Sequence, residues 1–377
     1  AKENQAVNDA ETRDQVANVL RDSKALNQSM QTLRDLVNSQ NQVQSTSDYI
    51  NEDQTQKDTY NNAINTGQSI ISGQHNPEMK KDTIDQAIGQ INNAKNDLQG
   101  ANKLQRDKTA ANQTISQLGY LNDPQKSGEE ALVNGSNTRS EVEEHLNEAK
   151  SLNNAMKQLR DKAAEKTNVK QSSDYINDST EHQRGYDQAL QEAENIINEI
   201  GNPTLNKSEI EQKLQQLTDA QNALQGSHLL EEAKNNAITE INKLTALNGA
   251  QRQKAIENVQ AQQTIPEVNQ QLTSDREINT AMQALRDKIG QQNNVHQQSN
   301  YFNEDEQPKH NYDNAVQAGQ TIIDKIQNPI MNKNEIEQAI NQINTTQTAL
   351  SGENKLHTDQ ESTNRQIEGL SSLNQAQ

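Results

Sequence analysis

The chain has 377 residues, and its composition excludes several classes of protein before any pattern is considered. Hydrophobic residues make up 30% of it and aromatic residues 2%, which is too little apolar surface for a large globular core. The formal net charge of -18 disfavours nucleic acid and anionic membranes as partners, because both reward clustered lysine and arginine. Since the chain has no cysteine, it has no disulfide, thiolate nucleophile or cysteine-based metal site. It also has no apolar run approaching the ~18 residues of a membrane span.

One unit recurs along the whole chain with a period of 126 residues. The string Ser-Asp-Tyr-Ile-Asn begins at Ser47 and again at Ser173, and the variant Ser-Asn-Tyr-Phe-Asn begins at Ser299. Other markers keep the same step: Met30, Met156 and Met282; Leu33, Leu159 and Leu285; Pro77, Pro203 and Pro329; Gly100, Gly226 and Gly352. A fixed internal period indicates a tandem array of one structural unit. The array starts in a permuted frame inside a polar stretch, so we expect the chain to be a piece of a longer polypeptide.

The middle copy opens with a helix followed by a break. Its apolar residues recur at intervals of three and four from Glu141 past Leu159, which predicts a first helix of about 25 residues. A polar stretch over residues 166–174 then interrupts the pattern. Asn177 is the expected N-cap of a second helix, as are its counterparts one period away, Asn51 and Asn303.

Two further helices complete a bundle of about 80 residues. The second helix is expected to carry an inward stripe from Tyr186 to Ile200 and to stop at Gly201, shortly before a proline. A third helix is expected to open at Asn206, with an inward face formed by Ile210, Leu214, Leu217 and Leu224. Antiparallel helices joined by short connections make a three-helix bundle.

A smaller bundle of about 45 residues follows in each period. Its apolar pattern resumes after Gly226 and breaks at Asn248-Gly249, and a shorter helix follows. Thr264 is the expected N-cap of the next helix, which runs on as the first helix of the following larger bundle. Neighbouring bundles are therefore expected to share a helix at this junction.

The junction at Gly226 and its counterparts Gly100 and Gly352 has two interpretations. As a C-cap the glycine would end the helix, and within a helix it would cost ~1 kcal/mol relative to alanine. We favour a continuous helix, because no proline follows and the apolar pattern restarts without a gap. A helix from Ser208 to Leu247 would be about 60 Å long. Shared helices leave no flexible linker, which predicts an all-α, elongated, stiff rod.

The expected module boundaries overlap along the shared helices. The larger three-helix bundles are expected at residues 16–100, 142–226 and 268–352. The smaller ones are expected at residues 101–146 and 227–272, with partial copies at 1–20 and 353–377.

Six of the seven tyrosines fall at two positions of the repeat: Tyr49, Tyr175 and Tyr301, and Tyr60, Tyr186 and Tyr312. The second set lies on the inward stripe and is expected in the core. The first set has two interpretations, of which we favour a ring that fills the core with its hydroxyl at the edge. The alternative is a partner-binding hot spot, for which tyrosine is a favoured residue. Tyr49, Tyr175 and Tyr301 are therefore the candidate partner-binding residues.

No catalytic, cofactor or metal site is indicated. None of the seven histidines recurs with the period, so we expect them to be solvent-exposed, and no zinc motif or phosphate-binding loop is found. Acidic pairs such as Glu129-Glu130 and Glu143-Glu144 do not repeat either. We expect them on exposed helix faces, without the apolar pocket that tunes a carboxylate for acid–base work. The sequence therefore predicts that the protein is not an enzyme.

The larger unit resembles the FIVAR module, and the smaller unit resembles the GA module, of giant staphylococcal extracellular matrix-binding proteins. The larger unit matches at Leu152-Asn153, Ala155-Met156, Leu159 to Asp161, Asp174 to Asn177, Tyr186, Ala189, Asn202-Pro203 and Ala220 to Leu224. The smaller unit matches at Ala233-Lys234, Ala237-Ile238, Ile241, Leu244 and Val268. The resemblance implies three-helix modules in a secreted, cell-wall-attached surface protein that binds host matrix, fibronectin in particular, and supports adhesion, biofilm and virulence.

Three functions follow as hypotheses. The first is an adhesin, a monomer without cofactors whose many weak sites together hold an immobilised matrix protein. The second is a purely structural spacer that has no ligand of its own. The third is albumin-type binding by the smaller modules, which the resemblance implies through an aromatic-containing surface. The corresponding segments, residues 122–138 and 248–264, hold no aromatic residue, so the third hypothesis is the weakest.

Overall fold

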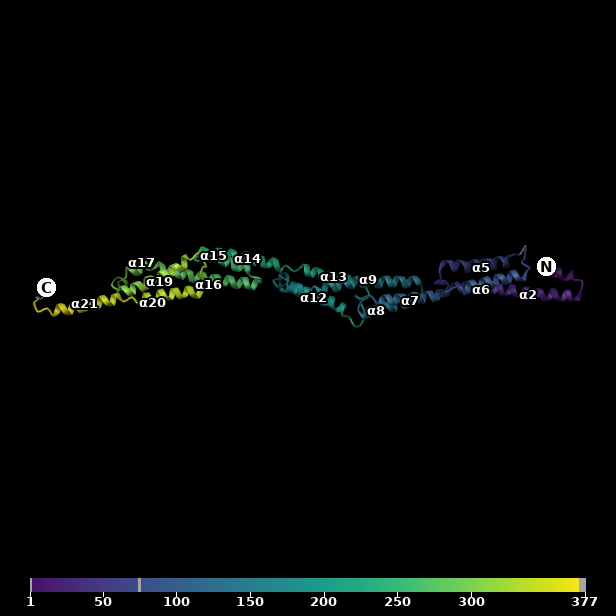
Figure 1. Ribbon diagram of the computed structural model, residues 1–377, viewed down its shortest axis with the longest axis horizontal. Coiled ribbons are helices and arrows are strands. Elements are labelled where there is room, and N and C mark those ends of the chain that lie inside the picture. The colour runs from purple at the N-terminus through teal and green to yellow at the C-terminus, as the bar shows by residue number, and fades with distance from the viewer. Residues whose placement is uncertain (1, 74–75, 373–377) are drawn as a thin grey trace. The chain divides into compact units, whose positions relative to one another are not determined.

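The computed structural model describes residues 2–73 and 76–372, and these residues form helices joined by turns, with no strand among them (Figure 1). The predicted all-α fold is confirmed. Two compact units are distinguished, residues 1–165 with 188–218 and residues 166–187 with 219–377, and each is described by itself. His75 and the ends of the two predicted partial modules, Ala1 and residues 373–377, lie outside the described residues.

The helices repeat in kind along the chain. The first unit holds α1 (Lys2–Asn8), α2 (Arg13–Asn38), α3 (Gln40–Gln44), α4 (Ser47–Ile50), α5 (Gln54–Ser72), α6 (Lys81–Asn96), α7 (Gly100–Ser116), α8 (Asp123–Gly135) and α9 (Arg139–Ala164). Two helices contribute residues to both units: α12 (Thr180–Ile197) and α13 (Lys207–Asn222). The second unit holds α10 (Lys166–Gln171), α11 (Ser173–Ile176), α14 (Gly226–Asn242), α15 (Gly249–Ala261), α16 (Ile265–Gly290), α17 (Gln292–His296), α18 (Ser299–Phe302), α19 (Glu306–Asp324), α20 (Lys333–Thr348) and α21 (Gly352–Glu368).

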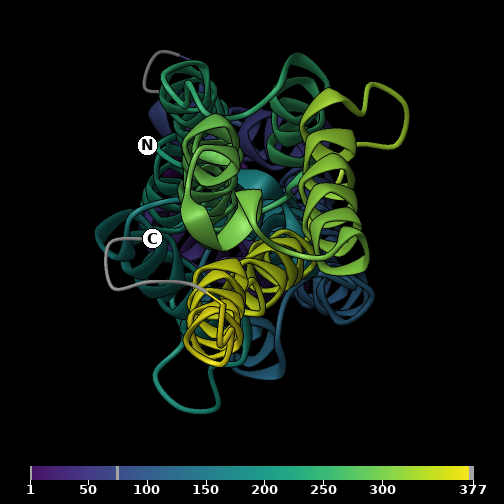
Figure 2. The same ribbon diagram turned by 90° about the vertical axis from the view of Figure 1, so that its left-hand side faces the viewer.

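The first and the last larger module are each a bundle of three long helices. In the first unit α2, α5 and α6 lie side by side (Figure 1), and their inward faces bury Leu33, Tyr60, Ile64, Ile84 and Ile91. In the second unit α16, α19 and α20 do the same, around Met282, Leu285, Tyr312, Ile336 and Ile343. Figure 2 shows the helices of this last module end-on. The narrow cores agree with the low apolar content of the chain, since each helix buries only one stripe.

Each smaller module packs three shorter helices around a core of alanine and aliphatic residues. The first copy combines α7, α8 and the start of α9, and buries Leu104, Ala111, Ile115, Val133, Val142 and Ala149. The second copy combines α14, α15 and the start of α16, and buries Leu230, Ala237, Ile241, Ala255, Val259 and Val268. The alanines allow neighbouring helices to approach closely. The resulting cores are small and contain no aromatic ring.

The passage from a smaller to a larger module is one uninterrupted helix, as the sequence predicts. In α16, Val268 belongs to the smaller core while Met282 belongs to the larger one. Thr264 caps this helix: its hydroxyl accepts a hydrogen bond from the Glu267 backbone, and the Glu267 carboxylate bonds back to the Thr264 N–H. Met331 from the larger module packs against the smaller core as well. The two cores therefore meet without a linker.

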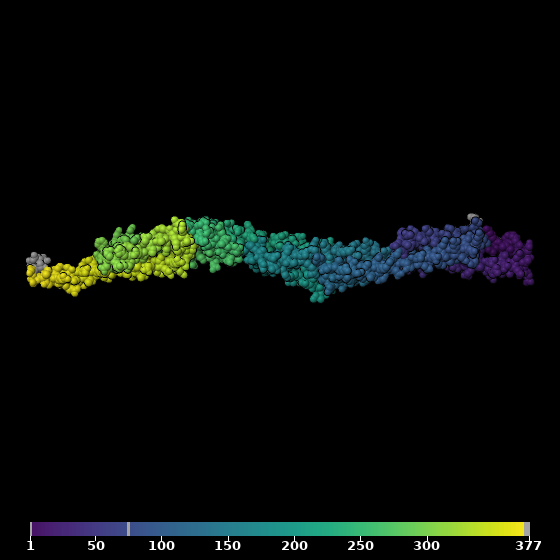
Figure 3. All heavy atoms as spheres, in the orientation of Figure 1, coloured from purple at the N-terminus to yellow at the C-terminus, as the bar shows by residue number. Residues whose placement is uncertain are grey.

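The passage from a larger to a smaller module differs from the prediction, because the helix through Gly226 is not continuous. α13 ends at Asn222 and α14 begins at Gly226, and the same break separates α6 from α7 and α20 from α21. Figure 1 shows α21 running on beyond the last larger module, and Figure 3 shows the chain narrowing at this end. The apolar pattern restarts at once because the break is only three residues long and its leucine is buried: Leu98, Leu224 or Leu350.

Glycine is required at this break for a reason other than capping. A Cβ built on Gly226 would lie 2.4 Å from the Ser173 carbonyl oxygen, 2.5 Å from that of Asp174 and 2.7 Å from the Asp178 nitrogen. Gly226 is thus the first residue of α14, and it lets that helix press directly on the backbone of the short helix α11. Gly100 and Gly352 show the same contacts, against α4 and α18 respectively.

The second helix of the larger module also departs from the prediction at both ends. Asn51 is the C-cap of α4 rather than the N-cap of α5, which begins after Asp53. The polar stretch of residues 166–174 is mostly helical, because α10 and the start of α11 occupy it. At the other end α12 stops at Ile197, and Ile200, expected on the inward stripe, is 92% exposed in the following loop.

Candidate functional site

The two tyrosine positions form an edge-to-face pair in every larger module. Tyr60, Tyr186 and Tyr312 are almost completely buried, as predicted, and each ring centroid lies 6.0 to 6.1 Å from that of its partner: Tyr49, Tyr175 or Tyr301. Such a geometry is favourable because the positive edge of one ring meets the negative face of the other. The pair therefore fixes the short helix α4, α11 or α18 to the bundle.

The candidate partner-binding tyrosines are half-buried and their hydroxyls are already hydrogen-bonded. Tyr175 and Tyr301 donate to Asp187 and Asp313, at 2.9 and 2.7 Å, and Tyr49 accepts from the Asn61 amide at 2.8 Å. Burial and the hydrogen bond to Asp313 raise the pKa of Tyr301 to about 12. Each of these tyrosines is followed in the sequence by an exposed apolar residue: Ile50, Ile176 or Phe302.

Three histidines contradict the expectation that all are solvent-exposed: His145, His182 and His296. His296 is half-buried and stacks on Tyr301, with ring centroids 4.2 Å apart. Its Nε2 lies 2.8 Å from Asp313. The stack occurs only in the third larger module because the other copies carry different residues at this position, Lys170 and Gln44.

A pair of asparagine hydrogen bonds joins the first and the second larger module to the smaller module that follows each of them. The Asn177 side chain accepts a hydrogen bond from the Ile265 N–H at 2.9 Å and donates to the Gln263 carbonyl at 3.1 Å, across 88 and 86 residues. Asn51 makes the same pair with Arg139 and Asn137, at 3.0 Å each. The first N–H groups of a helix lack partners within the helix, so the asparagine completes the capping of α16 or α9 from outside.

Replacing the buried Asn177 by alanine is expected to lower the free energy of unfolding by about 1–3 kcal/mol, because its hydrogen bonds to the Ile265 N–H and the Gln263 carbonyl are both lost. Asn303→Ala is the matched control, since Asn303 has a described bond only to Ser299, inside its own short helix. Urea denaturation of the full chain measures both. Equal losses for the two variants would show that the contact between modules adds nothing.

The smaller module in turn contacts the larger module after it. Gln251, fully buried in the first turn of α15, donates to the Ile330 carbonyl at 2.8 Å, and the Asn248 amide donates to Ile323 at 2.9 Å. In the preceding copy Gln125 and Asn122 bond in the same way to Thr204 and Ile196. The smaller modules are therefore held at both ends by buried side-chain hydrogen bonds within each unit.

Ion pairs strengthen the contact between a larger module and the smaller module that follows it in two of the three copies. Lys103 pairs with the buried Glu52 and with Asp53, and Lys355 pairs likewise with Glu304 and Asp305. The hydrogen bond from Lys355 lowers the pKa of Glu304 to about 2. In the middle copy Leu229 stands where the lysine is, and the aspartate Asp178 pairs with His182 instead. Comparing the copies position by position could have revealed this pairing, because the glutamate and the lysine are replaced in the same copy, by Asp178 and Leu229.

Glu129 contradicts the expectation of an exposed acidic pair. It is only 2% exposed, and burial, with a contribution from Glu148, raises the pKa of Glu129 to about 7. Asp275 in the next copy is also buried, and burial raises its pKa to about 6. Glu143 and Glu144 are exposed, as predicted. The smaller modules thus carry single buried carboxyls that short-range sequence patterns do not reveal.

These carboxyls should make stability depend on pH. A folded pKa above the unfolded one means that the folded state holds its proton more tightly, so the contribution is complete below about pH 4.5 and is lost as the pH rises through about 6 to 7. For Glu129 the loss is about 3 kcal/mol. The Glu129→Gln, Asp275→Asn variant should therefore gain thermal stability over the wild type as the pH rises from 4.5 to 8. A difference in melting temperature that does not change with pH would contradict this assignment.

Within the described part of the chain, no group of three or more histidine, aspartate and glutamate side chains is arranged to hold a metal ion. No helix among the described residues is long and apolar enough to span a membrane. The side chains that form the same hydrogen bonds in two copies, such as Asn177 and Gln251, lie at contacts between modules.

Comparison with known proteins agrees with this organisation. The FIVAR domain matches residues 29–99, 155–225 and 281–351, and the GA module matches residues 1–29, 101–155, 227–281 and 353–377. The extracellular matrix-binding protein ebh of Staphylococcus aureus is 37% identical over 377 residues, which are 100% of this chain and 4% of that protein. EbhA of the same species is 37% identical over the same length, which is 6% of it. A crystal structure of a domain of Staphylococcus aureus EbhA matches with a TM-score of 0.61 at 26% identity, covering 66% of this chain and 98% of that one.

Alternating three-helix bundles that share helices and form polar contacts with one another define a protein built of tandem helical modules. The chain belongs to the FIVAR domain family, with GA modules alternating between its FIVAR domains. The predicted resemblance is thereby confirmed. The relatives that it matches along its whole length are named as extracellular matrix-binding proteins, and the chain spans only 4% and 6% of the two described above.

Proposed function

We propose that this chain is part of a bacterial cell-surface adhesin whose repeated modules bind host extracellular matrix, with fibronectin as the target. The observation that carries the proposal is the identity of 37% to matrix-binding proteins over the full length of the chain. The unbroken repeat supports it physically. Many weak sites on one chain act together on an immobilised target, because each bound module raises the effective concentration of the next. Attachment to the cell wall and a role in biofilm belong to the same proposal.

Binding of the full chain to immobilised fibronectin tests this function. The chain should bind a fibronectin surface above the level of an unrelated helical bundle of similar negative charge. Immobilised albumin is the second surface, because it tests the albumin-type alternative for the GA modules. Binding to albumin alone would replace the proposed function with that alternative, and binding to neither would remove both.

The candidate residues Tyr49, Tyr175 and Tyr301 form part of this proposal. Each ring lies beside an exposed apolar side chain on the same short helix, and these side chains can be changed without opening the core: Ile50, Ile176 and Phe302. Replacing these three with serine should weaken binding to fibronectin while the circular dichroism and melting temperature stay unchanged. The Leu20→Ser, Leu370→Ser variant, which removes exposed leucines elsewhere, is the control.

A spacer function is the second candidate. It is favoured by the hydrogen bonds between modules and by the shared helices inside each unit. The stiff rod stays a prediction from the sequence. Small-angle X-ray scattering of the full chain tests it, since a rod gives a pair-distance distribution with a long linear tail. A compact or flexible profile would exclude it. This function is compatible with matrix binding, because a spacer can carry binding modules along its length.

A further inference from the structure

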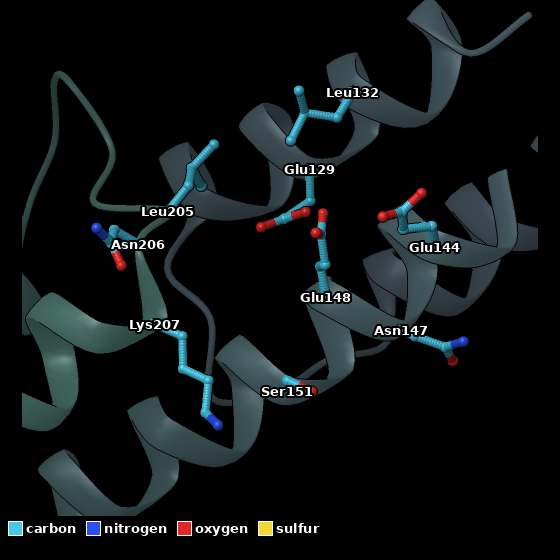
Figure 4. Close-up of a pocket in the computed structure, with 9 residues that line it drawn as sticks. All are labelled: Glu129, Leu132, Glu144, Asn147, Glu148, Ser151, Leu205, Asn206 and Lys207. Atoms are coloured by element: carbon cyan, nitrogen blue, oxygen red, sulfur yellow. The ribbon is translucent and has the colours of Figure 1, made fainter. Parts of the chain in front are cut away.

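A cleft of ≈ 580 Å³ opens in the first unit between α8, α9 and the loop that precedes α13. Figure 4 shows the carboxylates of Glu129 and Glu148 pointing toward one another across it, one from α8 and the other from α9. Leu132 and Leu205 supply apolar wall, and Lys207 lies at the rim. The loop approaches closely because Gly128 leaves space: a Cβ there would lie 2.9 Å from the Leu205 side chain.

The cleft contains an acceptor that the protein itself does not satisfy. Glu129 is 2% exposed, and its Oε2 has no hydrogen-bond partner among the described residues. Buried polar atoms are almost always hydrogen-bonded, so an unpaired carboxylate oxygen that faces a cavity indicates a missing donor. Glu148 engages His145 at 3.1 Å, and Lys207 lies 3.2 Å from Glu211. Neither pairing supplies a donor to Glu129.

The same cleft occurs one period earlier, in the same unit. There a cleft of ≈ 450 Å³ is lined by Glu3 and Asp22, which occupy the repeat positions of Glu129 and Glu148. Lys80 and Lys81 line it as well, and the Ser23 hydroxyl donates a hydrogen bond to Glu3. The following copy carries Ala255 and Ser274 at these positions. Since the bundle forms with or without the two acidic residues, the fold does not require them. A pair of carboxylates that recurs in two copies without a structural need indicates a ligand of positive charge.

We propose that the two acidic clefts each bind a basic side chain, the guanidinium of arginine or the ammonium of lysine, on an extended segment of a partner protein. Opposed carboxylates accept the several N–H donors of such a group, and charge-assisted hydrogen bonds are the strong ones. The leucine wall suits the alkyl stem, because long basic side chains lay their methylenes along apolar surface. A metal ion suits the site less well, since no three-ligand group among the described residues is arranged to hold one.

Protonation provides a signature of this binding. The groups that face Glu129 are Glu144, His145 and Glu148 from α9 and Lys207 from α13. Because burial raises the pKa of Glu129 to about 7, part of this carboxyl is protonated at neutral pH, and a bound cation displaces the proton. Binding to this cleft should therefore strengthen as the pH rises from 6 to 8 and should release protons to the buffer. Binding on an exposed acidic face would show neither effect.

The test uses the full chain and a blocked tripeptide, acetyl-Gly-Arg-Gly-amide, followed by saturation-transfer nuclear magnetic resonance and calorimetry. The isosteric citrulline peptide lacks only the charge, and the lysine peptide distinguishes ammonium from guanidinium. The Glu129→Gln, Glu148→Gln variant should lose one of two sites. Adding Glu3→Gln and Asp22→Asn should weaken binding by about tenfold or more. Glu143→Gln, an exposed change on α9, is the charge control and should bind like the wild type.

Three results would overturn the proposal: equal binding of the arginine and citrulline peptides, undiminished binding by the fourfold variant with its circular dichroism unchanged, or occupation by Ca²⁺ in place of either basic peptide. If the fourfold variant fails to fold, the citrulline comparison on the wild type still decides. No matrix protein is present in this test. Its outcome is therefore independent of whether the chain binds fibronectin.

Discussion

Replacing Gly100 by alanine is expected to lower the free energy of unfolding by about 3 kcal/mol, at the upper end of the usual cost of overpacking. A Cβ at this position would lie 2.5 Å from the Asp48 carbonyl oxygen and 2.6 Å from the Glu52 nitrogen. Both are backbone atoms, so they cannot move aside as a flexible side chain would. The short helix α4 must then separate from α7, and the polar contacts between the two modules break with it. Urea denaturation of the full chain measures the loss.

Gly89→Ala is the matched control for this substitution. Gly89 also lies in a helix of the first unit, α6, but nothing lies within 4 Å of the Cβ that alanine would add. Because alanine is the better helix former, this variant should be neutral or more stable by up to ~1 kcal/mol. If the two variants behaved alike, the glycine would be a matter of helix propensity and the close contact between α4 and α7 would not exist.

Replacing Tyr312 by alanine is expected to cost about 3–5 kcal/mol, the range for deleting a large buried aromatic side chain. Its ring is 0% exposed in the core of the last larger module, where it also forms the edge-to-face pair with Tyr301. Thermal and urea unfolding of the full chain measure the effect. A loss below about 1 kcal/mol would mean that the tyrosine pair does not hold the module together.

The phenylalanine variants separate the ring from the hydroxyl. The Tyr312 hydroxyl is buried and has no hydrogen-bond partner among the described residues, so Tyr312→Phe should be neutral or slightly stabilising. Tyr301→Phe removes a hydrogen bond to Asp313 and should cost about 1 kcal/mol. The reverse order would show that the Tyr312 hydroxyl has a partner after all.

Regular patterns made most of the helices predictable from the sequence. The stripe from Val142 to Leu159 and the N-cap at Thr264 are local features, and both predict the structure correctly. The break before Gly226 was not predictable in this way, because the apolar pattern continues across it. The glycine there is needed for contact with residues about 50 positions earlier in the chain, and no local propensity encodes that contact.

The polar contacts between modules were missed for the same reason. Asn177 lies next to a helix start in sequence, which favours an N-cap, but the helix whose N-terminus it caps begins 88 residues later. Glu129 looks like half of an exposed acidic pair, yet it is buried at a cleft formed by α8, α9 and the loop that carries Leu205. Comparison of the copies gives the one sequence signal for this burial, since Ala255 stands at the same position and is itself buried.

Dissociation of the full chain from fibronectin surfaces of different density is the measurement that tests the central claim most directly. The account predicts fast dissociation at low density and much slower dissociation at high density, because several modules then bind at once. Soluble fibronectin added during dissociation should accelerate the loss from the dense surface. A dissociation rate independent of density would contradict the claim that attachment arises from the repetition of weakly binding modules.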